Sequence, residues 1–177
     1  IPEKEKRKIR GAGIGMIFQD AGASLCPIRT IGEQIYESMR AHKKITRSEA
    51  KSRAMDLFDK LNFKDSQRVW DSYPFELSGG MNQRAGIAIA MLMNPPILFA
   101  DEPTSALDVS VQRQVVREML KLRELFGTAI VLVTHDIGVV RAMADTVLVL
   151  KNGKTVEYGT ADRVLNHPQD PYTRKLL

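Results

Sequence analysis

The sequence predicts an α/β fold, because short apolar runs typical of buried strands alternate with longer helical patterns. The clearest strand is residues 97–100, four apolar residues that lead directly to the carboxylates Asp101 and Glu102. The clearest helix start is the run Ser78-Gly79-Gly80, where serine is a good N-cap and helix formers follow. Ligands bind at the carboxyl ends of strands in open α/β sheets, and anions bind at glycine-rich helix starts. These two segments are therefore the first candidates for a functional site.

Length and composition predict one globular domain. The chain has 177 residues, of which 44% are hydrophobic and 27% charged. The longest apolar run, residues 85–93, is too short to span a bilayer and predicts a buried helix. No secretory signal opens the chain, and the first residue is not Met, so we expect the chain to begin inside a longer protein. The single cysteine, Cys26, excludes an internal disulfide and fits a reducing compartment.

The charge distribution argues against a nucleic-acid partner. The net charge is +5, and residues 1–10 alone hold five basic and two acidic side chains. A nucleic-acid binder usually carries its basic excess on a folded face, whereas this excess is concentrated at one short end. We therefore expect residues 1–10 to be a solvated segment and expect no nucleic acid among the partners.

The first half of the chain predicts one strand followed by several helices. Residues 11–19 end in a buried strand closed by Gln19; the glycines there precede the strand and open no helix, which excludes a dinucleotide fingerprint. Residues 20–30 are expected to form a loop, and residues 31–41, 47–61 and 66–72 helices. The second helix begins with a capping box between Thr46 and Glu49. Its apolar stripe consists of Ala50, Ala54, Leu57, Phe58 and Leu61. Trp70 is expected to be a packing anchor.

The second half returns to alternating strands and helices. Pro95 and Pro96 stop the helix that begins after Ser78, and Asp108 is expected to cap a helix at 109–126. Strands follow at 129–134, 146–150 and 155–158, and helices at 137–144 and 160–166. An Asn-Gly turn within 151–154 predicts a hairpin between the last two strands. The stripe of the 109–126 helix consists of Val115, Met119, Leu122, Leu125 and Phe126.

The order and spacing of these segments resemble the ATP-binding subunits of ABC transporters. Residues 77–81 look like their signature motif, 98–102 like Walker B, 105–108 like the D-loop and 134–136 like the H-loop. Gln19 stands where the Q-loop glutamine is expected. Residues 18–35, 167–173 and 176–177 narrow the resemblance to importers of dipeptides, oligopeptides and nickel. Ala21 and Cys26 depart from that group, which usually has Pro and Asn at these positions.

The resemblance implies a P-loop NTPase with a RecA-like, parallel-sheet core and an inserted helical subdomain. It divides the chain into a remnant of the ATPase core with the Q-loop (1–24), the helical subdomain ending in the signature helix (25–94), the ATPase core (95–159) and a C-terminal extension (160–177). The phosphate loop, Gly-x-x-x-x-Gly-Lys-Ser/Thr, does not occur in the 177 residues. In the family it precedes the Q-loop, so we expect it and the first strands to lie before Ile1.

The resemblance also implies a role for each candidate residue, with ATP and Mg²⁺ as cofactors. Asp101 and Gln19 would hold Mg²⁺, and Glu102, His135 and Gln19 would act in hydrolysis. The signature would close over ATP held by a second, antiparallel subunit through Ser78, Gly79 and Gly80. The D-loop at the dimer interface comprises Ser105, Ala106, Leu107 and Asp108. Each motif alone has a plainer structural alternative: a turn, a solvated acidic loop, a polar loop histidine and, for Asp108, a helix cap compatible with the D-loop role.

The implied function is an ATP-binding and ATP-hydrolysing subunit that energises an importer of peptides, nickel or similar small solutes. Its partners would be a second ATPase subunit, identical or different, integral membrane permease subunits and, indirectly, a solute-binding protein. It would lie peripherally on the cytoplasmic face of the cell membrane. Residues 1–177 alone are predicted to bind ATP poorly and not to hydrolyse it. The alternatives are a non-transport ABC ATPase of the phosphonate-breakdown type and a non-catalytic interaction module.

Overall fold

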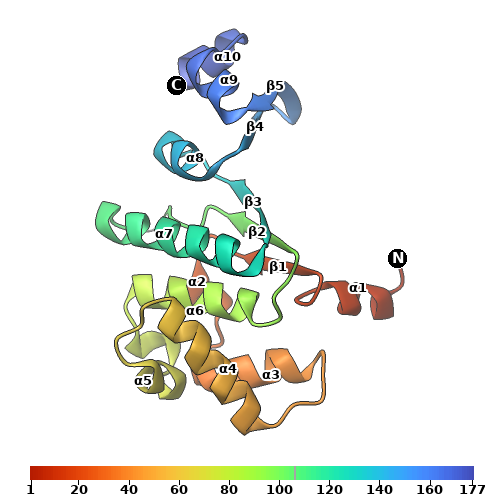
Figure 1. Cartoon of the computed structure of the whole chain (residues 1–177), viewed down its shortest axis with the longest axis vertical. Helices are drawn as coiled ribbons and strands as arrows, with labels where there is room; N and C mark the ends of the chain where they lie inside the picture. Colours follow the sequence, from red (N-terminus) through yellow and green to blue (C-terminus); the bar gives the residue numbers. More distant parts are fainter. Residues whose placement is uncertain (106) are drawn as a thin grey trace. The chain divides into compact units, whose positions relative to one another are not determined.

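The computed structural model describes residues 1–105 and 107–177, which form two compact units. The first unit is Ile1–Val133 and the second is Thr134–Leu177. Figure 1 labels their helices and strands. Ala106, one of the four residues predicted as the D-loop, lies outside the described residues. The four-part division of the chain inferred from sequence stays a prediction.

A three-stranded parallel sheet organises the first unit. Its strands are β1 (Ile14–Ile17), β2 (Ile97–Asp101) and β3 (Ala129–Val133), in the order β1-β2-β3. The register places Met16 beside Phe99 and Phe99 beside Val131. Parallel neighbours need a crossover connection, and helices supply it between each pair of strands. The predicted α/β fold and the strands expected at 97–100 and 129–134 are confirmed, with ends shifted by one residue.

The connection between β1 and β2 is almost entirely helical. It contains α2 (Ala21–Ser24), α3 (Ile31–Arg40), α4 (Arg47–Lys60), α5 (Ser66–Asp71), the 3₁₀ turn η1 (Pro74–Glu76) and α6 (Gly79–Met91). The capping box that begins α4 is confirmed, because Thr46 and Glu49 each accept the other's backbone N–H. The loop expected at 20–30 is wrong in part: the Asp20 carboxylate accepts the N–H of Ala23 at 2.9 Å and supports one helical turn.

The core of these helices contains the stripe predicted for α4, all five residues of which are buried. Trp70 is 3% exposed, which confirms it as a packing anchor. Its indole lies against α3 so closely that a Cβ at Gly32 would come within 2.4 Å of the ring. Glycine at this position is therefore required by packing between α3 and α5.

The sheet of the first unit has one buried and one partly exposed face. Ile17, Leu98 and Ala100 are buried, and a Cβ on Gly15 would lie 2.8 Å from the Ala90 carbonyl of α6. The alternate residues Met16, Phe99 and Val131 are 48%, 39% and 43% exposed. Because side chains alternate across a strand, these residues share the opposite face. Helix α6 therefore packs on one face of the sheet, and the other face presents apolar side chains to solvent.

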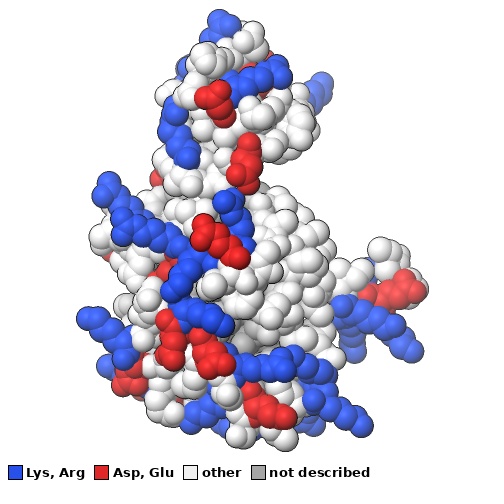
Figure 2. Space-filling view, in the orientation of Figure 1, with Lys and Arg blue, Asp and Glu red and all other residues white. Residues whose placement is uncertain are grey.

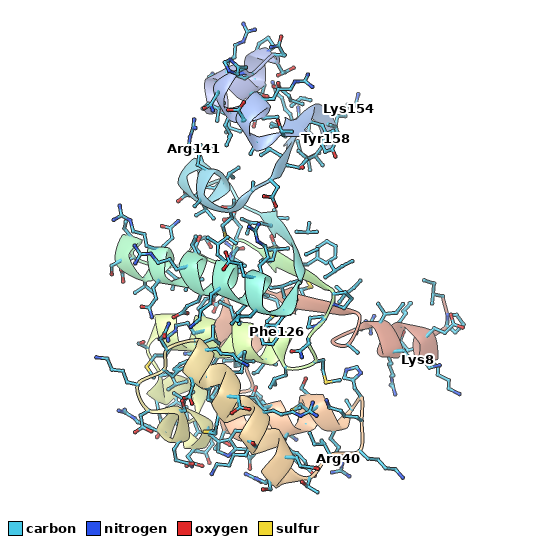
Figure 3. All side chains as sticks on the ribbon, viewed as in Figure 1. Lys8, Arg40, Phe126, Arg141, Lys154 and Tyr158 are labelled. Carbon is cyan, nitrogen blue, oxygen red and sulfur yellow. The ribbon has the colours of Figure 1, made fainter. Side chains whose placement is uncertain are left out.

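Helix α7 (Val109–Phe126) and helix α1 (Glu3–Ile9) complete the first unit. The stripe predicted for α7 is correct at Val115, Met119 and Leu122 but wrong at Leu125, which is 52% exposed at the last turn. The ring of Phe126 (labelled in Figure 3) instead lies 5.2 Å from Lys60 Nζ. Residues 1–10 are exposed as predicted, although α1 is helical. Figure 2 shows basic and acidic side chains interspersed over the visible surface.

The second unit is a hairpin with three helices. Its elements are α8 (Ile137–Met143), β4 (Thr146–Lys151), β5 (Lys154–Thr160), α9 (Ala161–Asn166) and α10 (Pro171–Leu176). Asn152 and Gly153 both have positive φ, as a two-residue type I′ hairpin turn requires, so the predicted Asn-Gly hairpin is confirmed. The buried Glu157 accepts the N–H groups of Gln169 and Asp170, which holds the start of α10 on β5. Helix α10 was not predicted. No helix in the two described stretches combines the length and apolarity needed to cross a bilayer.

Candidate functional site

The candidate site begins at the carboxyl end of β2, the middle strand of the sheet. Asp101 is the last residue of β2, and Glu102 follows it. Gln19 comes two residues after the end of β1, and both Asp101 and Gln19 are exposed. Because β1 and β2 are parallel neighbours, their carboxyl ends lie at the same edge of the sheet. The first unit thus brings Gln19, Asp101 and Glu102 to one edge.

The backbone of Glu102 adopts an uncommon conformation. Its φ is +47°, in the left-handed region, which costs a non-glycine residue roughly 1–2 kcal/mol. Hydrogen bonds hold it there: its N–H donates to the Val133 carbonyl at 2.9 Å, and its carbonyl accepts from the N–H and hydroxyl of Ser105 at 3.2 and 3.1 Å. Such strain persists only where its surroundings impose it, and it is frequent at functional sites. The turn ends β2 at Asp101. The Asp101 carboxylate therefore belongs to the strand, and the Glu102 carboxylate belongs to the turn.

The segment after Glu102 leads into α7 through Asp108. The Asp108 carboxylate accepts the N–H groups of Ser110 and Val111, both at 3.0 Å, and the Ser110 hydroxyl at 2.6 Å. These hydrogen bonds, the Ser110 hydroxyl above all, lower the pKa of Asp108. The predicted helix cap is confirmed. The role of Ser105, Leu107 and Asp108 as a D-loop stays a prediction.

The predicted signature segment lies at the exposed start of α6. Ser78 caps the helix by accepting the N–H of Met81 at 3.3 Å. Gly79 has open space where a Cβ would be, with no atom within 4 Å. A Cβ on Gly80 would lie 2.6 Å from Cγ1 of Val111 on α7. The two glycines therefore differ: Gly79 is open to solvent, and Gly80 allows the starts of α6 and α7 to approach closely.

Gln83 and Arg84 of α6 are buried. Arg84 donates through Nε to Glu118 of α7 at 2.9 Å and through Nη2 to the carbonyl of Leu61. Its guanidinium lies 4.2 Å from the ring centre of Phe63. Burial raises the pKa of Glu118, and hydrogen bonds from Gln114 and Arg84 oppose that rise. One signal was present in the sequence: Glu118 falls within the apolar stripe of α7, where a carboxylate needs a buried partner.

His135 belongs to the second unit and lies between a strand and a helix start. It is exposed and precedes Asp136, whose carboxylate caps α8 by accepting the N–H groups of Gly138 and Val139 at 2.7 and 3.2 Å. The Thr134 hydroxyl accepts the N–H of Asp136 at 3.1 Å. His135 is thus held on a short turn with a fixed backbone path. Its role toward a nucleotide stays a prediction.

Other candidate binding features are few in the described stretches. There, no group of three or more His, Cys, Asp or Glu side chains could hold a metal ion. A hollow of about 320 Å³ between α4, α6 and α7 contains no predicted site residue. Its lining is Arg53, Asp56, Leu57, Lys60, Met91, Leu92, Asn94 and Phe126. The sheet edge and the start of α6 therefore remain the principal candidates.

Comparison with known proteins decides the family. A model of the family described as ABC transporter matches residues 2–105, more than half of the chain and the part that contains Gln19, Ser78 and Glu102. The chain belongs to the ABC transporter family. The resemblance predicted from the motifs is confirmed, and so is the fold, which solved ABC cassettes share.

Curated relatives of this ABC protein carry names from import systems. It is 46% identical over 177 residues to a putative peptide import ATP-binding protein of Brucella melitensis biotype 1, covering all of this chain and 52% of that one. It is 44% identical over 173 residues to the glutathione import ATP-binding protein GsiA of Escherichia coli K12, covering 98% of this chain and 28% of that one. The chain therefore spans about half or less of the length of these relatives.

Two solved ABC cassettes have the same fold. The cassette MJ0796, in a dimeric post-hydrolysis state bound to ADP and Pi, superposes with a TM-score of 0.77 at 32% identity. That match covers 91% of this chain and 68% of the other. CbiO1 of Clostridium perfringens, part of the ABC transporter complex cbiONQ, gives a TM-score of 0.80 at 25% identity, covering 94% and 64%.

Proposed function

We propose that this chain is part of the ATP-binding, ATP-hydrolysing subunit of an ABC importer for peptides or peptide-like solutes. The names of the relatives at 46% and 44% identity support the solute class. The observation that carries the proposal is the set of side chains at one edge of the sheet. The middle strand ends there in Asp101, and Glu102 follows in the strained turn. Gln19 follows the neighbouring strand at the same edge. This edge suits Mg-ATP.

Each residue of this edge has a proposed task. Asp101 and Gln19 would hold the Mg²⁺ that accompanies ATP, and the ion would neutralise charge on the phosphates. Mg²⁺ usually takes only one or two carboxylates together with substrate phosphates, and the exposed carboxylate of Asp101 fits that donor set. Glu102 is the general base that accepts a proton from the attacking water. His135, which belongs to the second unit, has a separate proposed task, contact with the γ-phosphate of ATP.

The start of α6 serves ATP held by a second subunit. An exposed helix start carries partial positive charge and unpaired N–H groups, both of which favour a phosphate. The open space at Gly79 leaves its backbone accessible to a ligand arriving from outside the chain. Ser78, Gly79 and Gly80 would bind the γ-phosphate there. Residues 105–108 would lie at the interface between the two subunits, and the dimeric neighbour supports this arrangement.

The whole protein would work on the cytoplasmic face of the membrane with several partners. These are a second ATPase subunit, integral membrane permease subunits and, indirectly, a solute-binding protein. The neighbour that is part of an ABC transporter complex supports permease partners. Nickel is the alternative cargo. Uptake of labelled dipeptide, glutathione or Ni²⁺ by cells that contain the complete transporter separates the three.

One experiment tests ATP binding and hydrolysis together. Mg-ATP binding by calorimetry, and phosphate release, are measured on residues 1–177 and on a chimera that adds the phosphate-loop segment of the Brucella relative before Ile1. We propose that only the chimera binds tightly and hydrolyses ATP. In the chimera, Glu102→Gln lowers hydrolysis by about 10²–10⁴-fold and leaves binding unchanged, because general-base catalysis has that magnitude.

The control is Glu124→Gln, which removes an exposed carboxylate of α7. It should leave both binding and hydrolysis unchanged. Tight binding by residues 1–177 alone would contradict the assignment of the phosphate loop. Hydrolysis by the Glu102→Gln chimera within a few-fold of its parent would contradict the role of Glu102.

A further inference from the structure

Arg84 lies where three helices meet. It belongs to α6, its ion-pair partner Glu118 belongs to α7, and its second acceptor, the Leu61 carbonyl, follows the end of α4. The side chains of Arg84 and Glu118 are 10% and 2% exposed. The planar guanidinium has its donors in a fixed fork, so one side chain fixes groups on two other helices at once.

Two further contacts join the same helices. The missing Cβ of Gly80 lets the start of α6 reach Val111, near the start of α7. The Lys121 ammonium of α7 donates to the Lys60 carbonyl at the end of α4 at 3.0 Å. The end of α4 is thus held by one cation from α6 and another from α7, where a helix favours positive charge. The starts of α6 and α7 and the end of α4 form one connected structure.

We propose that Arg84 is a positioning residue, which holds residues 78–80 and 108–111 in a fixed mutual arrangement through Glu118. Its meaning for ATP rests on the proposed function, since residues 78–80 and Asp108 are there assigned to the contact with a second subunit. A buried ion pair seldom adds stability over apolar residues of similar volume. The pair therefore suits a geometric role: movement of the start of α6 toward an ATP is transmitted to the start of α7.

The test measures geometry inside the full chain of residues 1–177. Met81→Cys and Arg113→Cys each carry a spin label, and Cys26→Ser removes the natural thiol. Electron paramagnetic resonance then gives the distribution of distances between the two labels. Arg113 on α7 is exposed, and Met81 on α6 is half-buried. The variants are Arg84→Lys, which keeps the charge but not the fork, and the apolar pair Arg84→Met with Glu118→Leu. Arg117→Met, an exposed arginine of α7, is the matched control.

The expected result is a broadened distribution without loss of folding. We expect the parent and Arg117→Met to share one narrow distribution, and Arg84→Lys and the double variant to broaden it about two-fold. A double variant that unfolds cooperatively and keeps the narrow distribution would overturn the proposal. Should the double variant not fold, Arg84→Lys decides by the same criterion. The distance and unfolding measurements do not involve ATP. If the proposed hydrolysis were disproved, they would still decide whether Arg84 positions the two helices.

Discussion

At the scale of single residues, the Asp108 carboxylate makes the stability of the folded chain depend on pH. Its hydrogen bonds, the one from the Ser110 hydroxyl first, lower its pKa in the folded chain. A group whose pKa is lower in the folded state stabilises it above the unfolded pKa, and this stabilisation is lost as pH falls through the folded pKa. The contribution should therefore be complete at neutral pH, begin to decrease near pH 4, the ordinary range of an aspartate, and disappear as pH falls through the lower pKa of the folded chain.

Asp108→Asn isolates that effect, because asparagine is an equally good N-cap that does not ionise. We expect the difference in unfolding free energy between parent and variant, measured by urea denaturation, to be constant near neutral pH and to shrink in acid. Subtracting the variant's curve removes the contribution of other groups whose pKa is also lowered, such as Glu49 and Glu157. Parallel curves over the whole pH range would show that Asp108 contributes no pH dependence.

Residues whose partners are close in sequence could be predicted, and residues with distant partners could not. The caps at Thr46 and Asp108 depend on N–H groups two or three positions away, so the local sequence contains the whole interaction. Arg84 pairs with a carboxylate 34 positions away, and an arginine in a helix is ordinarily solvated. The left-handed backbone of Glu102 likewise depends on Val133, from another strand, and no local pattern indicates it.

At the scale of elements, the contact between α6 and α7 assigns different tasks to adjacent glycines. A Cβ on Gly80 would clash with Val111, whose β-branched side chain has little rotamer freedom in a helix. We expect Gly80→Ala to lower the unfolding free energy of residues 1–177 by about 1–3 kcal/mol, the usual cost of overpacking. Gly79→Ala, with no atom near its Cβ, should change it by less than about 0.5 kcal/mol.

The partner substitution distinguishes this clash from a backbone effect. Val111→Ala in the Gly80→Ala chain opens the space that the new methyl group needs, so most of the lost stability should return in the urea midpoint. If Gly80→Ala is as stable as Gly79→Ala, the close approach of the two helices does not constrain the sequence.

Helices with a clear period could be predicted, whereas two of the short helices could not. Helix α7 was predicted with its bounds at Val109 and Phe126, because Asp108 caps it and a long apolar stripe follows. Helices α2 and α10 have only four and six residues, too few for a periodic pattern. Leu125 fits the period of the α7 stripe but lies in the last turn, beyond the buried part. Period alone does not show where a helix leaves the core.

At the scale of the whole molecule, the partly exposed sheet face should make the chain associate. Met16, Phe99 and Val131 form one row across the three strands, each at least 39% exposed. Parallel sheets are ordinarily covered on both faces. We expect residues 1–177 to self-associate with rising concentration in sedimentation velocity, and Val131→Lys to weaken this by placing a charge in the row.

Leu125→Lys is the matched control, since Leu125 is as exposed but lies on α7 instead of the sheet. It should leave the association constant unchanged. A monomeric parent chain at all concentrations, or an equal effect of both lysines, would contradict a role of the sheet face in association.

The family and the α/β fold could be predicted because several short motifs occur in a fixed order along the chain. Residues 77–81 and 98–102 identify the family without any information on packing, and the family model and the solved cassettes confirm it. The open space at Gly79 and the exposed row on the sheet could not be predicted. Both depend on which elements cover a surface, and hydrophobic pattern alone does not contain that information.

The long helical connection between β1 and β2 affects the order in which the elements fold while the chain is being synthesised. Ile17 pairs with Ala100, so β1 has no β2 beside it until everything between them has been synthesised. At 5–20 residues per second, that wait is on the order of ten seconds. The contacts among α3, α4 and α5 lie within the connection and can form meanwhile. A slowly translated stretch just before Ile97 would lengthen the exposure of β1 to chaperones and proteases.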